Sequence, residues 1–161
     1  MVFGGSALPE YVSNMAKINR FEELDVWQLA RQLSDDIYWL TQKGTFSKDF
    51  ELKNQINRAS GSIMDNIAEG FGRANRAEFI LFLGYSSGSG TEVKSQLYRA
   101  FDRQHIPSDC FNELCARTDR VGKMLFGLIQ SLKKSPVRGL RYKVDEPEMA
   151  YLIDDFPKPA P

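Results

Sequence analysis

The chain has 161 residues, of which 42% are hydrophobic and 12% aromatic, so one domain with a real core is expected and a disordered chain is excluded. Lys plus Arg and Asp plus Glu both number 21, so the net charge is zero, which argues against indiscriminate binding to nucleic acid. The only cysteines are Cys110 and Cys115, and there is one histidine, which disfavours a structural metal site.

The densest apolar run, residues 79–85, is too short to cross a bilayer, and the N-terminus has no secretory signal pattern. Two unpaired thiols suit a reducing compartment. We therefore expect a cytoplasmic protein that does not contact a membrane.

Residues 1–20 contain Gly4, Gly5 and Pro9 and are predicted to form a flexible tail. Two stretches with apolar residues at steps of three and four, the helical period, follow. The first ends at Lys43-Gly44 and uses Val26, Leu29, Leu33, Ile37 and Leu40. The second stops at residues 70–72 and uses Leu52, Ile56, Ala59, Ile63 and Ile67.

The third stretch is predicted to run from about Ala77 to Gln104, with apolar positions Phe79, Phe82, Leu83, Val93, Leu97 and Phe101. Its middle, residues 85–91, is rich in Gly and Ser, which are poor helix formers. A loop between two short helices is one interpretation. We prefer one helix, with small residues where a neighbour packs close, because the apolar period continues on both sides.

The fourth stretch opens near Ser108 and ends at Lys133-Lys134. It carries a heptad seam, which predicts packing in a left-handed bundle: Phe111, Leu114, Thr118, Val121, Leu125, Leu128 and Leu132. Short connections favour antiparallel neighbours. The predicted fold is therefore all-α, an up-down-up-down four-helix bundle over residues 21–134.

Residues 135–161 change character and are predicted to form a proline-rich extension. A basic cluster is followed by an acidic one that includes Asp145, Glu146 and Glu148. The extension is either a mobile tail or a segment that docks on the bundle or on a partner through its apolar residues, Met149, Tyr151, Leu152, Ile153 and Phe156.

A polar stripe on the second helix is the most informative feature. Its spacing of 7, 4, 3 and 4 puts the following residues on one face: Gln55, Ser62, Asn66, Glu69 and Arg73. A matching stripe on the third helix contains Ser89, Glu92, Gln96 and Arg99. A solvated face and a ligand site are the alternatives. We prefer a half-buried hydrogen-bond network that fixes helix register or assembly, because the stripe on the second helix is rich in short amides and hydroxyls.

The string Asn66-Ile-Ala-Glu-Gly-Phe-Gly-Arg73, with Gln55-Ile56, Glu78-Phe79 and Gly88-Ser89, resembles the bacterial four-helix-bundle family encoded in intervening sequences of 23S rRNA, also known as S23 ribosomal proteins. The resemblance covers about residues 20–132. It implies a bundle that assembles as a ring-shaped homopentamer without established enzymatic activity. It also implies a link to RNA metabolism. The chain departs from the family pattern at residues 86–91, where the family is richer in Ala and Leu.

Catalytic patterns are scarce. There is no Glu-x-x-His motif for a di-iron centre and no phosphate-binding loop, so no cofactor is expected. Arg99 and His105 are similar to the Arg…His pair of HEPN-type ribonucleases, but Ala100 replaces the usual polar residue after the arginine. His105 is more simply interpreted as a residue interacting with the dipole at a helix C-terminus.

These patterns favour a non-enzymatic, homo-oligomeric scaffold. If the polar stripe supports it, Asn66→Leu and Glu69→Ala should each disturb assembly or stability more than a typical surface substitution, which changes the free energy of unfolding by no more than about 0.5 kcal/mol. An RNA-associated protein and a HEPN-like ribonuclease are the alternatives. RNA contact would use the basic residues Arg58, Arg76, Lys133, Lys134, Arg138 and Arg141. The expected partners are further copies of the chain and, in the alternative, RNA or another protein.

Overall fold

The computed structural model describes residues 18–134. The predicted N-terminal tail to residue 17, the C-terminal extension, and with it Arg138 and Arg141, lie outside the described residues. Within the described part four long helices follow one another: α2 (Asp25–Thr41), α3 (Phe50–Gly72), α4 (Arg76–Asp102) and α5 (Ser108–Lys134). Two short 3₁₀ turns, η1 (Phe21–Glu23) and η2 (Phe46–Lys48), precede α2 and α3.

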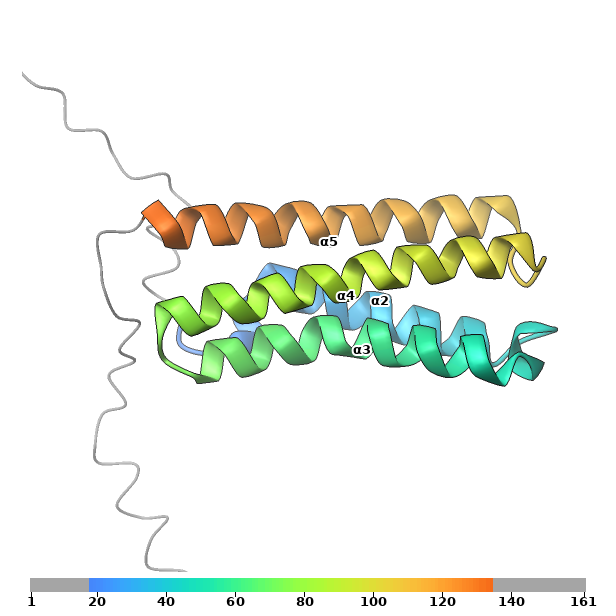
Figure 1. Ribbon diagram of the computed structural model, residues 1–161, viewed down its shortest axis with the longest axis horizontal. Coiled ribbons are helices and arrows are strands. Elements are labelled where there is room, and N and C mark those ends of the chain that lie inside the picture. The colour runs from blue at the N-terminus through green and yellow to red at the C-terminus, as the bar shows by residue number, and fades with distance from the viewer. Residues whose placement is uncertain (1–17, 135–161) are drawn as a thin grey trace, which may run out of the picture.

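The helices form the predicted antiparallel four-helix bundle (Figure 1). Each helix packs on its neighbour in sequence, and α5 closes the bundle by packing on α2. The helices α2 and α4 therefore lie diagonally across the core from each other. No helix among the described residues is long and apolar enough to span a membrane.

The helix boundaries follow local capping chemistry. The Asp49 carboxylate accepts a hydrogen bond from the Leu52 amide at 3.2 Å and caps α3. The Asn75 side chain accepts from the amides of Ala77 and Glu78 and caps α4. Gln104 adopts a left-handed φ of 57°, and the hydrogen bond from the His105 amide to the Ala100 carbonyl then ends α4 in a Schellman turn. The helix α4 therefore ends at Asp102, two residues before Gln104, the end predicted from the sequence.

The core is made of most positions of the predicted apolar stripes. It also contains seven buried apolar residues that were not among the predicted core positions: Leu24, Trp27, Ala30, Phe46, Phe71, Ala100 and Ile106. Phe101, in contrast, is 38% exposed and stacks on Phe111 at the bundle edge. The helical period places Phe101 only one position from the buried Ala100, so sequence spacing assigned the larger side chain to the core.

The Gly/Ser-rich middle of α4 is one continuous helix, as predicted. Ser86 is fully buried and its hydroxyl donates to the Ile63 carbonyl at 2.8 Å, which joins α4 directly to the backbone of α3. Gly90 is buried with Ile63 beside it. Small residues are therefore needed where α4 meets α3, whereas Gly84 and Gly88 face open space.

Candidate assembly surface

The two predicted polar stripes face each other along the seam between α3 and α4. At its centre the Ser89 hydroxyl lies 3.0 Å from the Ser62 hydroxyl, which crosses from one helix to the other. The side-chain amide of Asn66 donates hydrogen bonds to the backbone carbonyl of Ser62 at 2.7 Å and to the Ser62 hydroxyl at 3.0 Å. All three side chains are half-buried. Ser62, Asn66 and Ser89 therefore form one linked group, named here the seam triad.

The stripe continues at one end through a second cross-helix contact. The Arg99 guanidinium donates to the Gln55 side-chain oxygen at 2.7 Å and lies 3.8 Å from the Glu51 carboxylate. Between this contact and the seam triad, Gln96 donates to Glu92 on its own helix at 3.0 Å. The side-chain oxygen of Gln96 is buried without a hydrogen-bond partner among the described residues, so the polar seam is incompletely satisfied at this point.

At the other end, Glu69 and Arg73 do not join the seam triad. Arg73 forms an ion pair with Glu69 at 2.6 Å and lies 3.9 Å from Glu78, and the bond to Glu69 raises the pKa of the guanidinium. The Glu69 side chain is 51% exposed and the Arg73 side chain 48%, so solvent screens this i,i+4 pair and it contributes little to stability. The predicted single network is thus four separate groups along one face.

A patch of apolar side chains borders this seam on α4. It consists of Leu81, Phe82 and Tyr85 and is named here the α4 patch. Leu81 is 51% exposed and Tyr85 is 52% exposed, and the rings of Phe82 and Tyr85 meet at 5.6 Å. The Arg73 guanidinium lies 5.3 Å from the Phe82 ring centroid, in cation–π geometry. Large exposed apolar groups beside half-buried polar groups have the composition of a protein interface.

A cluster that the sequence did not reveal lies at the bundle end where α4 turns into α5. Nε2 of His105 lies 2.9 Å from the Asp49 carboxylate, and Nδ1 lies 2.8 Å from the Thr45 hydroxyl. The ring stacks on Phe46 at 5.1 Å, and Arg103 donates to Asp49 at 2.6 Å. Together, the hydrogen bonds to His105 and Arg103 outweigh desolvation and lower the pKa of Asp49 to about 2.

The predicted role of His105 as a helix-dipole residue is therefore wrong, because its side chain contacts the residues before α3 rather than the end of α4. Arg99 meanwhile contacts Gln55 and Glu51. No hydrogen bond between Arg99 and His105 is present in the described part, so the two side chains of the ribonuclease-like pair are engaged with different partners.

The candidate RNA-contacting residues do not form one surface. Arg76 begins α4 and Lys133 and Lys134 end α5, at the same end of the bundle (Figure 1). Arg58 lies on α3, about 21 Å along the helix from the α3 end that reaches them. The two cysteines are free thiols on α5, and burial raises the pKa of each.

The family model described as 23S rRNA-intervening sequence protein matches residues 22–127, which include α2, α3, α4 and most of α5. The chain belongs to this family. It is also similar to the crystal structure of a protein of unknown function from the S23 ribosomal protein family of Bacteroides thetaiotaomicron. That likeness has a TM-score of 0.60 at 22% identity over 65% of this chain and 98% of the other, and it shows the fold alone. Comparison with curated proteins finds no match.

Proposed function

We propose that this member of the intervening-sequence protein family is a cytoplasmic, non-enzymatic assembly module that forms a homo-oligomeric ring, with five copies as the expected number. The observation that carries the proposal is the α4 patch beside the seam triad. The patch offers the exposed side chains of Leu81 and Tyr85 beside the half-buried Phe82 ring, which would bury apolar area in a contact, and the triad offers hydroxyl and amide groups of fixed position. Aromatic anchors next to fixed polar groups are the usual centre of a specific interface.

A ring of identical copies needs two different faces on each copy, because the contacts are head-to-tail. The second face is proposed to lie on α2, diagonally across the bundle, where Trp39 is 57% exposed and its ring meets that of Tyr38 at 5.3 Å. In the proposed ring, the α4 patch of one copy contacts the Trp39 face of the next.

The experiment measures size by light scattering coupled to size exclusion for the full chain and for Tyr85→Ser, Trp39→Ser and Tyr98→Ser. We expect the first two variants to lose the ring and to elute as monomers, because each loses one face. Tyr98 is the matched control, since it is the same residue type on the same helix with the same 52% exposure but lies on the side of α5. Tyr98→Ser should keep the wild-type size.

Mixing the two disrupted variants tests the ring geometry. The intact Trp39 face of Tyr85→Ser should pair with the intact α4 patch of Trp39→Ser, so an equimolar mixture should form heterodimers and nothing larger. A wild-type chain that is monomeric at micromolar concentration would overturn the proposal. Homodimers of Trp39→Ser alone would contradict the ring and indicate a two-fold contact between α4 patches.

The seam triad makes a separate prediction about assembly. Asn66→Leu should weaken the oligomer at least tenfold in dissociation constant, because the leucine removes both hydrogen bonds to Ser62 and cannot pair across the seam. Asp65→Leu is the control, since Asp65 is exposed on the same helix one position away. Analytical ultracentrifugation over a dilution series would measure both. Equal dissociation constants for the two variants would speak against a role of the triad in assembly.

A further inference from the structure

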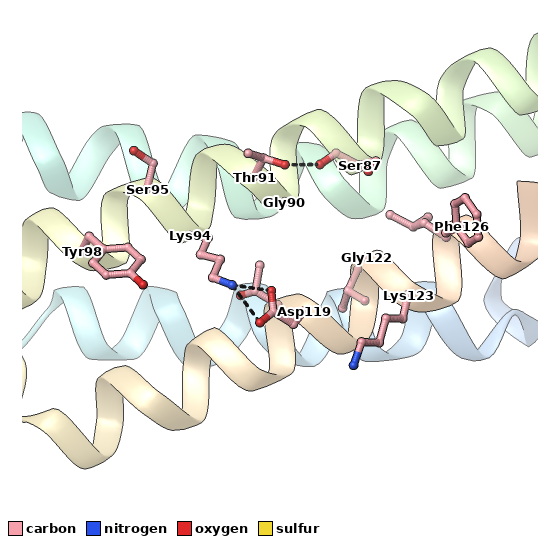
Figure 2. Close-up of a pocket in the computed structure, with 13 residues that line it drawn as sticks. Ser87, Gly90, Thr91, Lys94, Ser95, Tyr98, Asp119, Gly122, Lys123 and Phe126 are labelled. Carbon is pink, nitrogen blue, oxygen red and sulfur yellow. Dashed lines mark hydrogen bonds and ion pairs between the residues drawn. The ribbon is translucent and has the colours of Figure 1, made fainter.

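A second exposed surface lies between α4 and α5, on the side of α4 away from the seam. Figure 2 shows an open groove whose walls carry Tyr98 from α4 and Phe126 from α5. Small residues line it between these rings, among them Gly90 and Gly122, and a side chain added at Gly122 would meet nothing within 4 Å. Phe126 is 64% exposed although it borders a helix–helix contact. The groove therefore has room and apolar walls for an additional segment.

The charges of this groove favour an acidic occupant. Lys94 is held by Asp119 through two contacts of 2.7 and 2.8 Å across the two helices (Figure 2). Lys123 also lines the groove, is exposed, and forms no ion pair among the described residues. The groove thus combines apolar walls with one uncompensated positive charge.

The chain itself contains a segment of matching chemistry after α5. Residues 145–156 hold five acidic residues and no basic residue, and the acids flank an apolar centre, Met149-Ala-Tyr-Leu-Ile153. A segment with an apolar centre and acidic flanks complements a groove with apolar walls and a free lysine.

The connection is long enough for this segment to return to its own groove. Along α5, Phe126 lies about 12 Å and Thr118 about 24 Å before the helix end at Lys134. Residues 135–148 span about 45 Å when extended, so they can bring Met149 alongside either residue. A tether of this length gives a local concentration in the millimolar range, which favours the chain's own segment over a free partner.

We propose that residues 145–156 dock intramolecularly in the α4–α5 groove, with the apolar centre against Phe126 and Tyr98 and an acidic flank beside Lys123. The docked segment covers the exposed Phe126 ring and leaves the α4 patch and the Trp39 face free. Docking is therefore independent of the proposed ring, and each can fail without the other.

The test replaces Tyr151 in the full chain by the photo-crosslinker p-benzoylphenylalanine. An equal mixture of ¹⁵N-labelled and unlabelled protein is irradiated, and the crosslinked peptides are identified by mass spectrometry. We expect products between position 151 and peptides covering residues 87–98 and 118–126, with the same isotope in both halves. Phe126→Ser should reduce their yield at least fivefold. Lys123→Glu should also reduce the crosslink yield, whereas the same charge reversal at the exposed Arg58 of α3, Arg58→Glu, should leave the yield unchanged.

Tyr85→Ser separates this proposal from the ring, because it should change the size of the oligomer and leave the crosslink yield unchanged. Circular dichroism melting verifies that each variant is folded. If Phe126→Ser does not fold, the crosslink yield of Lys123→Glu tests the groove instead. Crosslinks spread over other faces, or a yield that neither groove variant changes, would overturn the proposal. Products that join a labelled to an unlabelled chain would overturn its intramolecular form.

Discussion

Asp49→Ala is expected to lower the free energy of unfolding by about 3 kcal/mol, the largest loss for any substitution of a polar residue considered for this chain. The alanine removes the cap of α3, worth about 1 kcal/mol. It also removes the acceptor of the hydrogen bond from the largely buried His105, which is worth about 1.5–3 kcal/mol because the bond is to a charged group. The second bond that Asp49 accepts, from Arg103, adds little because the Arg103 side chain is 43% exposed. Urea unfolding at pH 7, at one protein concentration, measures the change.

Asp49 also predicts how stability changes in acid. Its pKa is about 2 in the folded chain and 3.8 in the unfolded chain, so the folded state favours the carboxylate. The stabilisation, at most about 2 kcal/mol, is fully present above about pH 5, decreases as the pH falls below 3.8 and is lost as the pH falls through 2. Between pH 5 and pH 2 the wild type should therefore lose more stability than Asp49→Ala, in which only the other carboxylates still titrate, and the difference should be at most about 2 kcal/mol.

Asp49→Asn separates the cap from the charge. Asparagine is an equally good capping residue, so this variant should keep α3 capped and lose only the charge-dependent part of the stability. It should fall between the wild type and Asp49→Ala. Asp65→Asn on the exposed side of α3 serves as the control and should lie within about 0.5 kcal/mol of the wild type. If both Asp49 variants melted like this control, the cluster around His105 would not stabilise the bundle.

Gly70→Ala is expected to destabilise the bundle by about 2 kcal/mol, although alanine is the better helix former. A Cβ at Gly70 would lie 2.5 Å from the Cβ of Phe82 and 3.1 Å from the Phe79 ring, so α4 has to move away from α3. The opposed atom is a Cβ held by the α4 backbone and cannot rotate aside. Thermal unfolding followed by circular dichroism would detect the loss as a lower Tm.

Gly61→Ala is the matched control for Gly70→Ala. Gly61 lies in the same helix, and a Cβ there would meet nothing within 4 Å. The variant should gain about 0.5–1 kcal/mol, because alanine loses less backbone entropy than glycine in a helix. Opposite signs for the two variants would show that Gly70 is required for close helix contact. A gain for both would mean that α3 and α4 are not in tight contact at Phe82.

The local sequence determined the fold class, the number of helices and most of the buried face of each helix. The apolar period of residues 52–67 and the heptad seam of residues 114–132 specify one buried stripe per helix, and a stripe has only another stripe to pack against. The single helix through residues 85–91 was also predictable, because the period continues across the small residues. Ser62, Asn66 and Ser89 could be placed on facing stripes from spacing alone.

Only the tertiary structure decided which polar residues bond. Glu69 and Arg73 share a face with Asn66 in the sequence pattern, yet their side chains pair with each other in solvent. Asp49 and His105 lie far apart in the chain and meet because two loops end at the same end of the bundle. The apolar period describes one helix at a time. These contacts, and the approach of Phe82 to Gly70, depend instead on the distance and rotation between two helices, which side-chain packing across the bundle determines.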